Sequence, residues 1–353
     1  MLPVSVLDLA PVVQGATPGE ALRNALDLAR HADHWRYNRY WVAEHHNMRG
    51  IASAATSIVI GYIAGGTERI RVGAGGIMLP NHSPLVIAEQ FGTLACLYPG
   101  RIDLGVGRAP GTDQRTWLAL RRDPASAARF PQDVLELQAL LGPVQPGQVI
   151  QAVPGADANV PLWILGSSLF GAQLAAMLGL PYAFASHFAP ELLMPALEVY
   201  RARYEPSQQN ARAWAMVGVS VIVAETDMEA RRLFTSVQQH MTNTLRGNRG
   251  RLPPPIDDID VYWSPEEKLE VARKLACSFV GSPETVRREL QSFVARTGAD
   301  ELIVNGMVFD HAARLRSYEL LAEEVTPSLT KERAPGQESS ANDLHDDDNW
   351  AAG

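Results

Sequence analysis

Short apolar runs alternate along this chain with longer segments whose apolar residues recur at helical spacing. Residues 4–10 form an almost continuous apolar run, which predicts a buried strand. Over residues 20–35 the apolar side chains fall on one broad face, which predicts an amphipathic helix. Strands that alternate with helices in this way are typical of a parallel sheet covered by helices.

Eight strand–helix pairs can be traced along the sequence. The predicted strands span residues 4–10, 40–44, 71–79, 102–106, 163–165, 182–185, 216–224 and 301–305. The predicted helices span residues 20–35, 53–64, 84–97, 125–141, 169–178, 191–204, 227–239 and 312–324. Eight such units favour an α/β fold of the (β/α)8 TIM barrel type. A doubly wound sheet is the competing fold, but residues 9–15 carry no glycine fingerprint for a phosphate after the first strand.

Two segments interrupt the repetition. The first is an insertion after strand 7, at about residues 240–280, in which residues 246–258 are rich in glycine, proline and charge. A loop after a barrel strand belongs to the catalytic mouth, although a solvated linker between helices would have the same composition. The second is the acidic segment 331–353, which is predicted to be a disordered C-terminal tail. The barrel is therefore assigned to residues 1–330.

The composition narrows the class of protein. The 353 residues are 46% hydrophobic with a net charge of −8, and the tail, with two basic and six acidic side chains, holds half of that charge. A large basic surface for nucleic acid is therefore not expected. The N-terminus lacks the features of a signal peptide, and no apolar run is long enough to span a membrane. With only Cys96 and Cys277 present, no disulfide framework is expected, and the predicted location is cytoplasmic.

The residues that could carry chemistry lie at predicted strand ends, which form the active-site face of a barrel. Glu44, His45 and His46 follow the second strand, and on an extended chain only one of the two imidazoles can face the barrel axis. An imidazole can relay protons near neutral pH, but a hydrogen-bonded core histidine would have the same sequence pattern. No metal site is predicted, because no His-x-His motif follows the first strand to supply further ligands.

Glycines mark the third and fourth strands. Gly75 and Gly76 indicate a bulge, close approach of a flat ligand, or a tight contact between a helix and the strand. Gly107 precedes Arg108 in a run that resembles a nucleotide motif but is one residue too long. Arg108 could anchor an anion, or it could form an ion pair at the barrel rim.

Small residues begin the helix after the fifth strand. Gly166, Ser167, Ser168 and Gly171 would leave free N–H groups and a positive helix end for a phosphate. Helix capping alone would also explain a serine there. Neither serine fits the G-x-S-x-G elbow, so a serine hydrolase is not expected.

Five segments together resemble the bacterial luciferase-like family of flavin-dependent monooxygenases over about residues 4–325. They are residues 41–46, 71–80, 84–90, 99–113 and 279–284, and their combination is specific. The likeness is to the single-chain members that are similar to the luciferase α subunit. The resemblance implies a (β/α)8 barrel that binds reduced FMN, activates O2 as a flavin C4a-hydroperoxide and oxygenates a small organic substrate.

The resemblance also implies roles for single residues. His45 matches the catalytic histidine and Glu44 the acid before it, while Gly75 and Gly76 match a non-prolyl cis peptide beneath the flavin ring. Two positions depart from the luciferase α subunit: Gly107 replaces a reactive cysteine, and Ser167 replaces a glutamate of the phosphate pocket. The residues assigned to the cofactor are Gly75, Gly76, Gly107, Arg108, Gly166, Ser167, Ser168 and Gly171.

Partners are expected on the same basis. A separate NAD(P)H:flavin reductase would supply reduced flavin, since the chain has no evident nicotinamide module, and a homodimer would form through the helices after the second and third strands. Substrate contacts are expected from the loop at 246–259 and from Asp8, Asn81, His82 and His187.

Three other functions use parts of the same pattern. A deazaflavin (F420)-dependent oxidoreductase would transfer hydride on the same barrel, but the Glu–His–His pattern favours FMN. A non-catalytic flavin-binding barrel would not need His45. A metal-dependent hydrolase is the third alternative.

Overall fold

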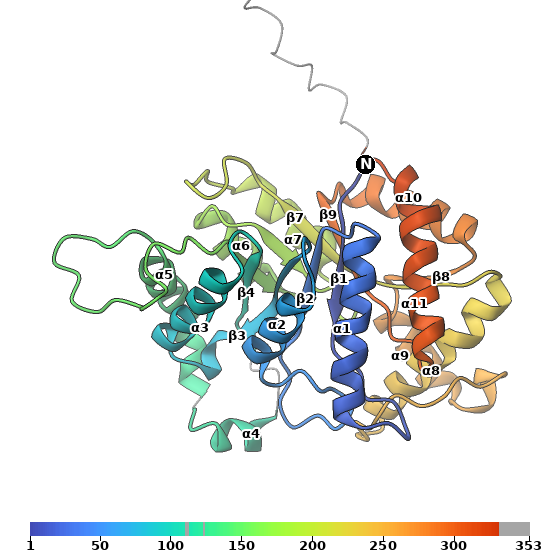
Figure 1. Ribbon diagram of the computed structural model, residues 1–353. Coiled ribbons are helices and arrows are strands. Elements are labelled where there is room, and N and C mark those ends of the chain that lie inside the picture. Colours follow the sequence, from blue (N-terminus) through green and yellow to red (C-terminus); the bar gives the residue numbers. More distant parts are fainter. Residues whose placement is uncertain (110–112, 123, 332–353) are drawn as a thin grey trace, which may run out of the picture.

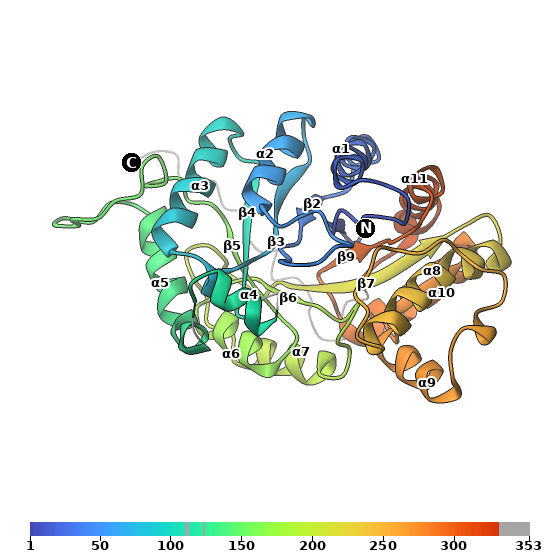
Figure 2. The ribbon, with the colours of Figure 1, turned by 90° about the horizontal axis from the view of Figure 1, so that it is seen from below.

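Within the described residues, eight parallel strands close into a barrel, shown in Figures 1 and 2. The computed structural model describes residues 1–109, 113–122 and 124–331. Neighbouring strands follow chain order, and the ring closes because β7 pairs with both β6 and β9 and because β9 pairs with β1. This confirms the predicted fold. The barrel strands are β1 (Val4–Asp8), β2 (Arg39–Val42), β3 (Arg71–Met78), β4 (Ile102–Gly107), β5 (Leu162–Gly166), β6 (Tyr182–Phe184), β7 (Ala215–Val223) and β9 (Glu301–Asn305).

Helices cover the outside of this barrel, as Figure 2 shows. The predicted helix at 125–141 begins as a 3-10 helix, Pro124–Arg129, and becomes α-helical at Phe130, where Pro131 occupies the first turn. A short helix, α4 (Gln114–Ala119), lies in the loop after β4 and was not predicted. The covering helices are α1 (Pro18–His34), α2 (Thr56–Gly65), α3 (Pro84–Leu97), α5 (Phe130–Leu141), α6 (Leu169–Met177), α7 (Leu193–Ala202), α8 (Asp227–Leu245) and α11 (His311–Leu320).

The insertion after β7 is larger than predicted. It contains α9 (Pro265–Lys274), β8 (Ser278–Gly281) and α10 (Pro283–Thr297) in addition to the end of α8. Among the described strands, β8 pairs with the last residues of β7, Ser220 to Val223, of which all but Ser220 lie beyond the part of β7 that pairs with β9. The expected bounds of about 240–280 therefore cut through α8 and β8, because a four-residue strand is too short to show a periodic pattern.

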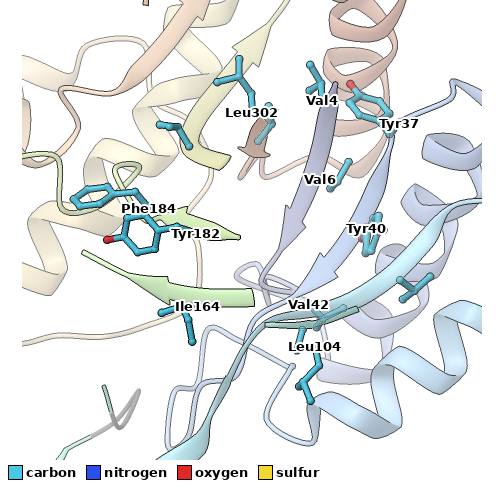
Figure 3. Close-up of a cluster of buried hydrophobic side chains, with 14 of the residues drawn as sticks. Val4, Val6, Tyr37, Tyr40, Val42, Leu104, Ile164, Tyr182, Phe184 and Leu302 are labelled. Carbon is cyan, nitrogen blue, oxygen red and sulfur yellow. The ribbon is translucent and has the colours of Figure 1, made fainter. Parts of the chain in front are cut away.

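Alternate strand residues face the helices or the barrel interior. Val6 and Tyr40 belong to the layer between strands and helices, part of which is drawn in Figure 3. At the N-terminal end of the interior, Arg39 forms ion pairs of 2.7 Å with Asp103 and 3.0 Å with Glu301, and both carboxylates are fully buried. Side chains thus fill the N-terminal end of the interior, and in a barrel of this type a ligand has access from the C-terminal ends of the strands. The apolar residues that face inward are Leu7, Trp41, Ala43, Trp163, Ala183, Met216 and Ile303.

No helix in the described ranges is both long and apolar enough to cross a membrane. Residues 332–353 of the predicted tail lie outside the described residues. The same holds for residues 110–112 of the segment that carries the family resemblance.

Candidate functional site

The C-terminal ends of the barrel strands meet at the lower end of the molecule in Figure 1, and Figure 2 views this end, which we call the mouth. The insertion loop lies here, because Val13 in the loop after β1 forms a bridge with Leu252. The Val12 N–H in turn donates to the Gly50 carbonyl in the loop after β2, at 2.9 Å. The loop at 246–258 therefore borders the mouth and is not a detached linker.

Glu44 is the organising carboxylate of the mouth and is 1% exposed. Its Oε1 accepts from His46 Nε2 at 2.7 Å and from His82 Nε2 at 2.9 Å, and its Oε2 accepts from the Met78 N–H at 3.0 Å. Burial alone would raise the pKa of Glu44, but these three hydrogen bonds lower it to about 2. Since a carboxylate only accepts, both imidazoles carry their proton on Nε2.

The same three side chains satisfy the spacing of a metal site, with potential ligand atoms of Glu44, His46 and His82 within 4.8 Å of one another. The hydrogen bonds already satisfy the carboxylate without an ion. The arrangement instead ties the loop after β2 to the end of β3.

His45 lies between Glu44 and His46 in the chain, and its backbone N–H donates to the Ser53 carbonyl at 3.2 Å. Burial lowers its pKa to about 4, although the Glu44 charge acts in the other direction, and His46 and Arg249 lower it further. Its buried Nδ1 has no hydrogen-bond partner within the described part of the chain. Buried polar atoms without partners are rare outside functional sites, so His45 is a candidate for proton transfer.

His187, in the loop after β6, is a second imidazole of the same kind. Burial and the neighbouring His45 lower its pKa to about 4, and its buried Nδ1 also finds no partner among the described residues. The absence of a side chain at Gly218 makes room for the ring, since a Cβ there would lie 2.5 Å from His187 Nδ1. The prediction had placed His187 at the mouth without a link to His45.

The glycines of β3 pack tightly inside the barrel. The peptide bond between Gly75 and Gly76 is cis, as the resemblance implied. A Cβ on Gly75 would lie 2.7 Å from a Leu7 methyl group, and one on Gly76 would lie 2.8 Å from the Gly105 carbonyl oxygen. Contacts with other strands of the barrel, and not with a helix, are therefore sufficient to require glycine at both positions.

The ends of β4 and β5 adjoin at the mouth. Gly107 pairs with Leu165, which sets Arg108 beside Gly166. Arg108 is exposed, stacks 4.1 Å from the centre of the Phe170 ring and forms no ion pair with any residue in the described ranges.

The N-terminus of α6 completes this corner of the mouth. Ser168 is the N-cap residue, and its side chain makes no capping bond to the helix as described. The first N–H groups of the helix are thus open to an anion. Ser167 and Gly171 flank them, and a Cβ on Gly171 would meet only ordinary contacts from 3.4 Å outward. An uncapped helix end beside a guanidinium without a carboxylate partner is the chemistry that a phosphate monoester requires.

The predicted substrate residues separate into different groups. Asp8 is fully buried, accepts from Arg314 at 2.7 Å and from the Ala10 N–H at 2.8 Å, and contacts the Tyr40 hydroxyl, so its assignment to substrate is corrected to a structural ion pair. The His82 side chain donates to Glu44. Asn81 is 6% exposed, and its backbone carbonyl accepts from Arg122 Nε at 3.2 Å. Only His187 adjoins His45.

Arg249 was missed as an individual residue, although its loop was expected at the mouth. Its charge is one of those that lower the pKa of His45. The sequence signal was present, because the insertion loop holds arginines separated by glycine and asparagine at residues 246–251.

Comparisons with known proteins identify the family. The family model of luciferase-like monooxygenases matches residues 3–301. A luciferase-like monooxygenase of Escherichia coli strain K12 is 54% identical over 317 residues, which cover 90% of this chain and 95% of the relative. The crystal structure of apo-MsnO8 has a TM-score of 0.87 at 38% identity, and the match covers 94% of this chain and 100% of that one.

A more distant structure shows the fold alone. It is the oxygenating constituent of 3,6-diketocamphane monooxygenase from Pseudomonas putida, a type II Baeyer–Villiger monooxygenase in complex with FMN. Its TM-score is 0.70 at 19% identity, and the match covers 94% of this chain and 99% of that one. On the family model and the close relatives, this chain belongs to the luciferase-like monooxygenase family.

Proposed function

We propose that this protein is a flavin-dependent monooxygenase that uses reduced FMN and O2 to oxygenate a small organic substrate. One observation carries the proposal: Arg108, which has no carboxylate partner among the described residues, and the uncapped N-terminus of α6 share a mouth with His45 and His187. Bound reduced FMN would supply the electrons that activate O2. Arg108, Ser167 and Ser168 would hold its phosphate, and the Gly75–Gly76 backbone would lie under its ring.

The side chains of the mouth then have separate tasks. His45 is neutral at neutral pH, so its Nδ1 can accept a proton from the reacting centre or return one. His187 adds a second neutral imidazole beside it. Glu44 holds the loop after β2 against the end of β3. The buried walls of the mouth limit access of water.

The cofactor can be tested directly. Purified protein is titrated anaerobically with reduced FMN and, in parallel, with reduced F420, and binding is measured by calorimetry. We expect saturable binding of reduced FMN. In Arg108→Ala its affinity should fall ~10-fold or more, because a charge-assisted phosphate contact is lost. A matched control, Arg203→Ala, changes an exposed arginine at the C-terminal end of α7. Preferential binding of F420 would support the dehydrogenase alternative instead.

The oxygen reaction separates an enzyme from a flavin store. After oxygen is admitted, the FMN-loaded protein should oxidise its flavin at a rate that depends on His45. A rate identical to that of free FMN, unchanged in His45→Asn, would indicate a non-catalytic flavin-binding barrel.

The same proposal includes partners and location. Reduced flavin would come from a separate NAD(P)H:flavin reductase, since the described residues form one barrel with its insertion. A second copy of the chain would cover exposed apolar residues on α2 and α3, including Ile58 and Leu97, which are 73% and 64% exposed. Cys96 and Cys277 are both free, which suits the reducing cytoplasm.

A further inference from the structure

Two loops bring arginines together at one edge of the mouth. A Cβ built on Gly50 would lie 2.3 Å from the Gly250 carbonyl oxygen and 3.4 Å from Arg251 Cα, so the two backbones touch. Arg49 precedes Gly50, and Arg249 and Arg251 flank Gly250. We call these three residues the arginine cluster. Hydrogen bonds fix the contact, because Leu252 N donates to Val12 O at 3.1 Å and Gln14 N donates to Leu252 O at 2.8 Å.

The charges of the arginine cluster are not balanced. All three side chains are exposed, and none forms a hydrogen bond or ion pair with another part of the described chain. Two other basic side chains of the insertion are paired: Arg246 binds Glu267 at 2.7 Å, and Lys268 binds Asp260 at 2.7 Å.

The nearby carboxylate of Asp113 does not serve the arginine cluster either. It accepts from Asn47 at 3.3 Å and caps the start of α4 through the Thr116 N–H. The backbone contact between the two loops therefore gathers three exposed positive charges at one edge of the mouth, in a chain whose net charge is −8, and such a local excess of positive charge attracts an anion.

The position of the arginine cluster relates it to the reaction. The Arg249 charge is near enough to His45 to affect its ionisation. Around the eight-stranded ring, β1 and β5 are four steps apart and so lie opposite each other. The cluster, which is packed against the loops after β1 and β2, therefore lies on a different side of the mouth from the Arg108 site at β4 and β5.

We propose that the arginine cluster binds an anionic group of the substrate, a carboxylate or sulfonate, so that the protein acts on small organic anions. This inference rests on the proposed function, because it assigns the opposite anion site to the flavin phosphate. Guanidinium groups bind such planar or tetrahedral anions through paired N–H donors. The anion would hold one end of the substrate at the rim and leave its other end beside His45 and His187.

The test uses matched probes on the full chain, with and without bound FMN. Hexanoate and hexanamide have the same chain length and differ in charge, and their binding is measured by calorimetry. We expect hexanoate to bind at least ~10-fold more tightly than hexanamide, and Arg249→Met to remove that preference while Arg249→Lys retains part of it. Arg203→Met, at the opposite end of the barrel, is the control and should change nothing.

The affinity for FMN distinguishes a site for the substrate anion from a site for the flavin phosphate. Arg249→Met should leave the affinity for FMN unchanged, whereas Arg108→Ala should lower it. The inference is overturned if the wild-type protein binds both probes equally or binds neither. It is also overturned if Arg249→Met still prefers hexanoate to hexanamide, or if this variant loses affinity for FMN instead. Selective hexanoate binding in a protein that fails to bind FMN would reject the proposed function and leave the arginine cluster as an anion site.

Discussion

His187 lies close enough to His45 that a positive charge on His45 lowers the pKa of His187. Each imidazole also buries an Nδ1 without a hydrogen-bond partner among the described residues. A protein loses stability at each such atom, because an unmade buried hydrogen bond costs about 1–3 kcal/mol. Ligand or substrate atoms at the mouth are the natural partners of both nitrogens.

Replacement of His45 should therefore affect the reaction more than the fold. In His45→Asn the rate constant for oxidation of bound reduced FMN by O2 should fall by about 100-fold, the usual contribution of a positioned acid–base group. Stopped-flow absorbance measures it. His187→Asn should give a smaller decrease, and His34→Asn, an exposed residue of α1, should give none. Equal rates in His45→Asn and the wild type would remove His45 from the mechanism.

The same two histidines predict how stability depends on pH. Their folded-state pKa values of about 4 lie below the ordinary 6.5, so between these values the unfolded chain binds more protons than the folded one. Stability should thus be constant above about pH 6.5 and fall as the pH decreases towards 4. Groups facing His45 include Glu44, His46 and Arg249, and Glu44, with a pKa of about 2, stays charged over this window.

Urea unfolding at pH 7 and pH 5 measures this effect. The free energy of unfolding should be lower at pH 5 by on the order of 1–3 kcal/mol, with a smaller difference in the double variant His45→Asn/His187→Asn. If the double variant shows the same difference in unfolding free energy between pH 7 and pH 5 as the wild type, other groups control the pH dependence.

The sequence predicted long elements with a periodic apolar pattern better than short ones. Helix α1 has a long apolar face and a Thr17–Glu20 capping box, and it begins within two residues of the predicted position. Strand β8 has four residues and was missed, because its partner, the end of β7, is distant in sequence and only the fold brings the two together.

The site divides in the same way. Glu44 and His45 were identifiable because they are adjacent in the chain and follow a strand. The role of Asp8 was not, because its partner Arg314 lies on the last helix and nothing local in the sequence links them. Arg249 likewise acquires its place only through contact between two loops.

Asp8 should prove structural when it is changed. Asp8→Asn leaves the Arg314 guanidinium buried at 4% exposure without its counter-charge, and breaking a buried pair in this way typically costs about 3–5 kcal/mol. Urea unfolding should show this loss. FMN affinity at a temperature where the variant is folded should match the wild type, and a loss of affinity without a loss of stability would restore Asp8 to the binding site.

Two glycines of β4 offer a matched pair. A Cβ on Gly105 would lie 2.3 Å from the Ala74 carbonyl oxygen, which is backbone, whereas one on Gly107 would lie 3.4 Å from the flexible Met78 Sδ. Gly105→Ala should lower the free energy of unfolding by about 1–3 kcal/mol or more, as overpacking does, and Gly107→Ala should leave it nearly unchanged. Thermal unfolding followed by circular dichroism compares them. Equal effects would show that the β3–β4 contact is looser than described.

The proposed dimer can be tested through charge on its surface. Ile58 on α2 and Leu97 on α3 are exposed apolar residues, so a lysine at either position should disrupt a self-association that buries them. Light scattering after size exclusion should give a dimer for the wild type and a monomer for Ile58→Lys/Leu97→Lys. Met228→Lys, which changes an 80% exposed residue at the start of α8, is the control and should remain dimeric. A wild-type monomer, or a double variant that still dimerises, would place the interface elsewhere or exclude it.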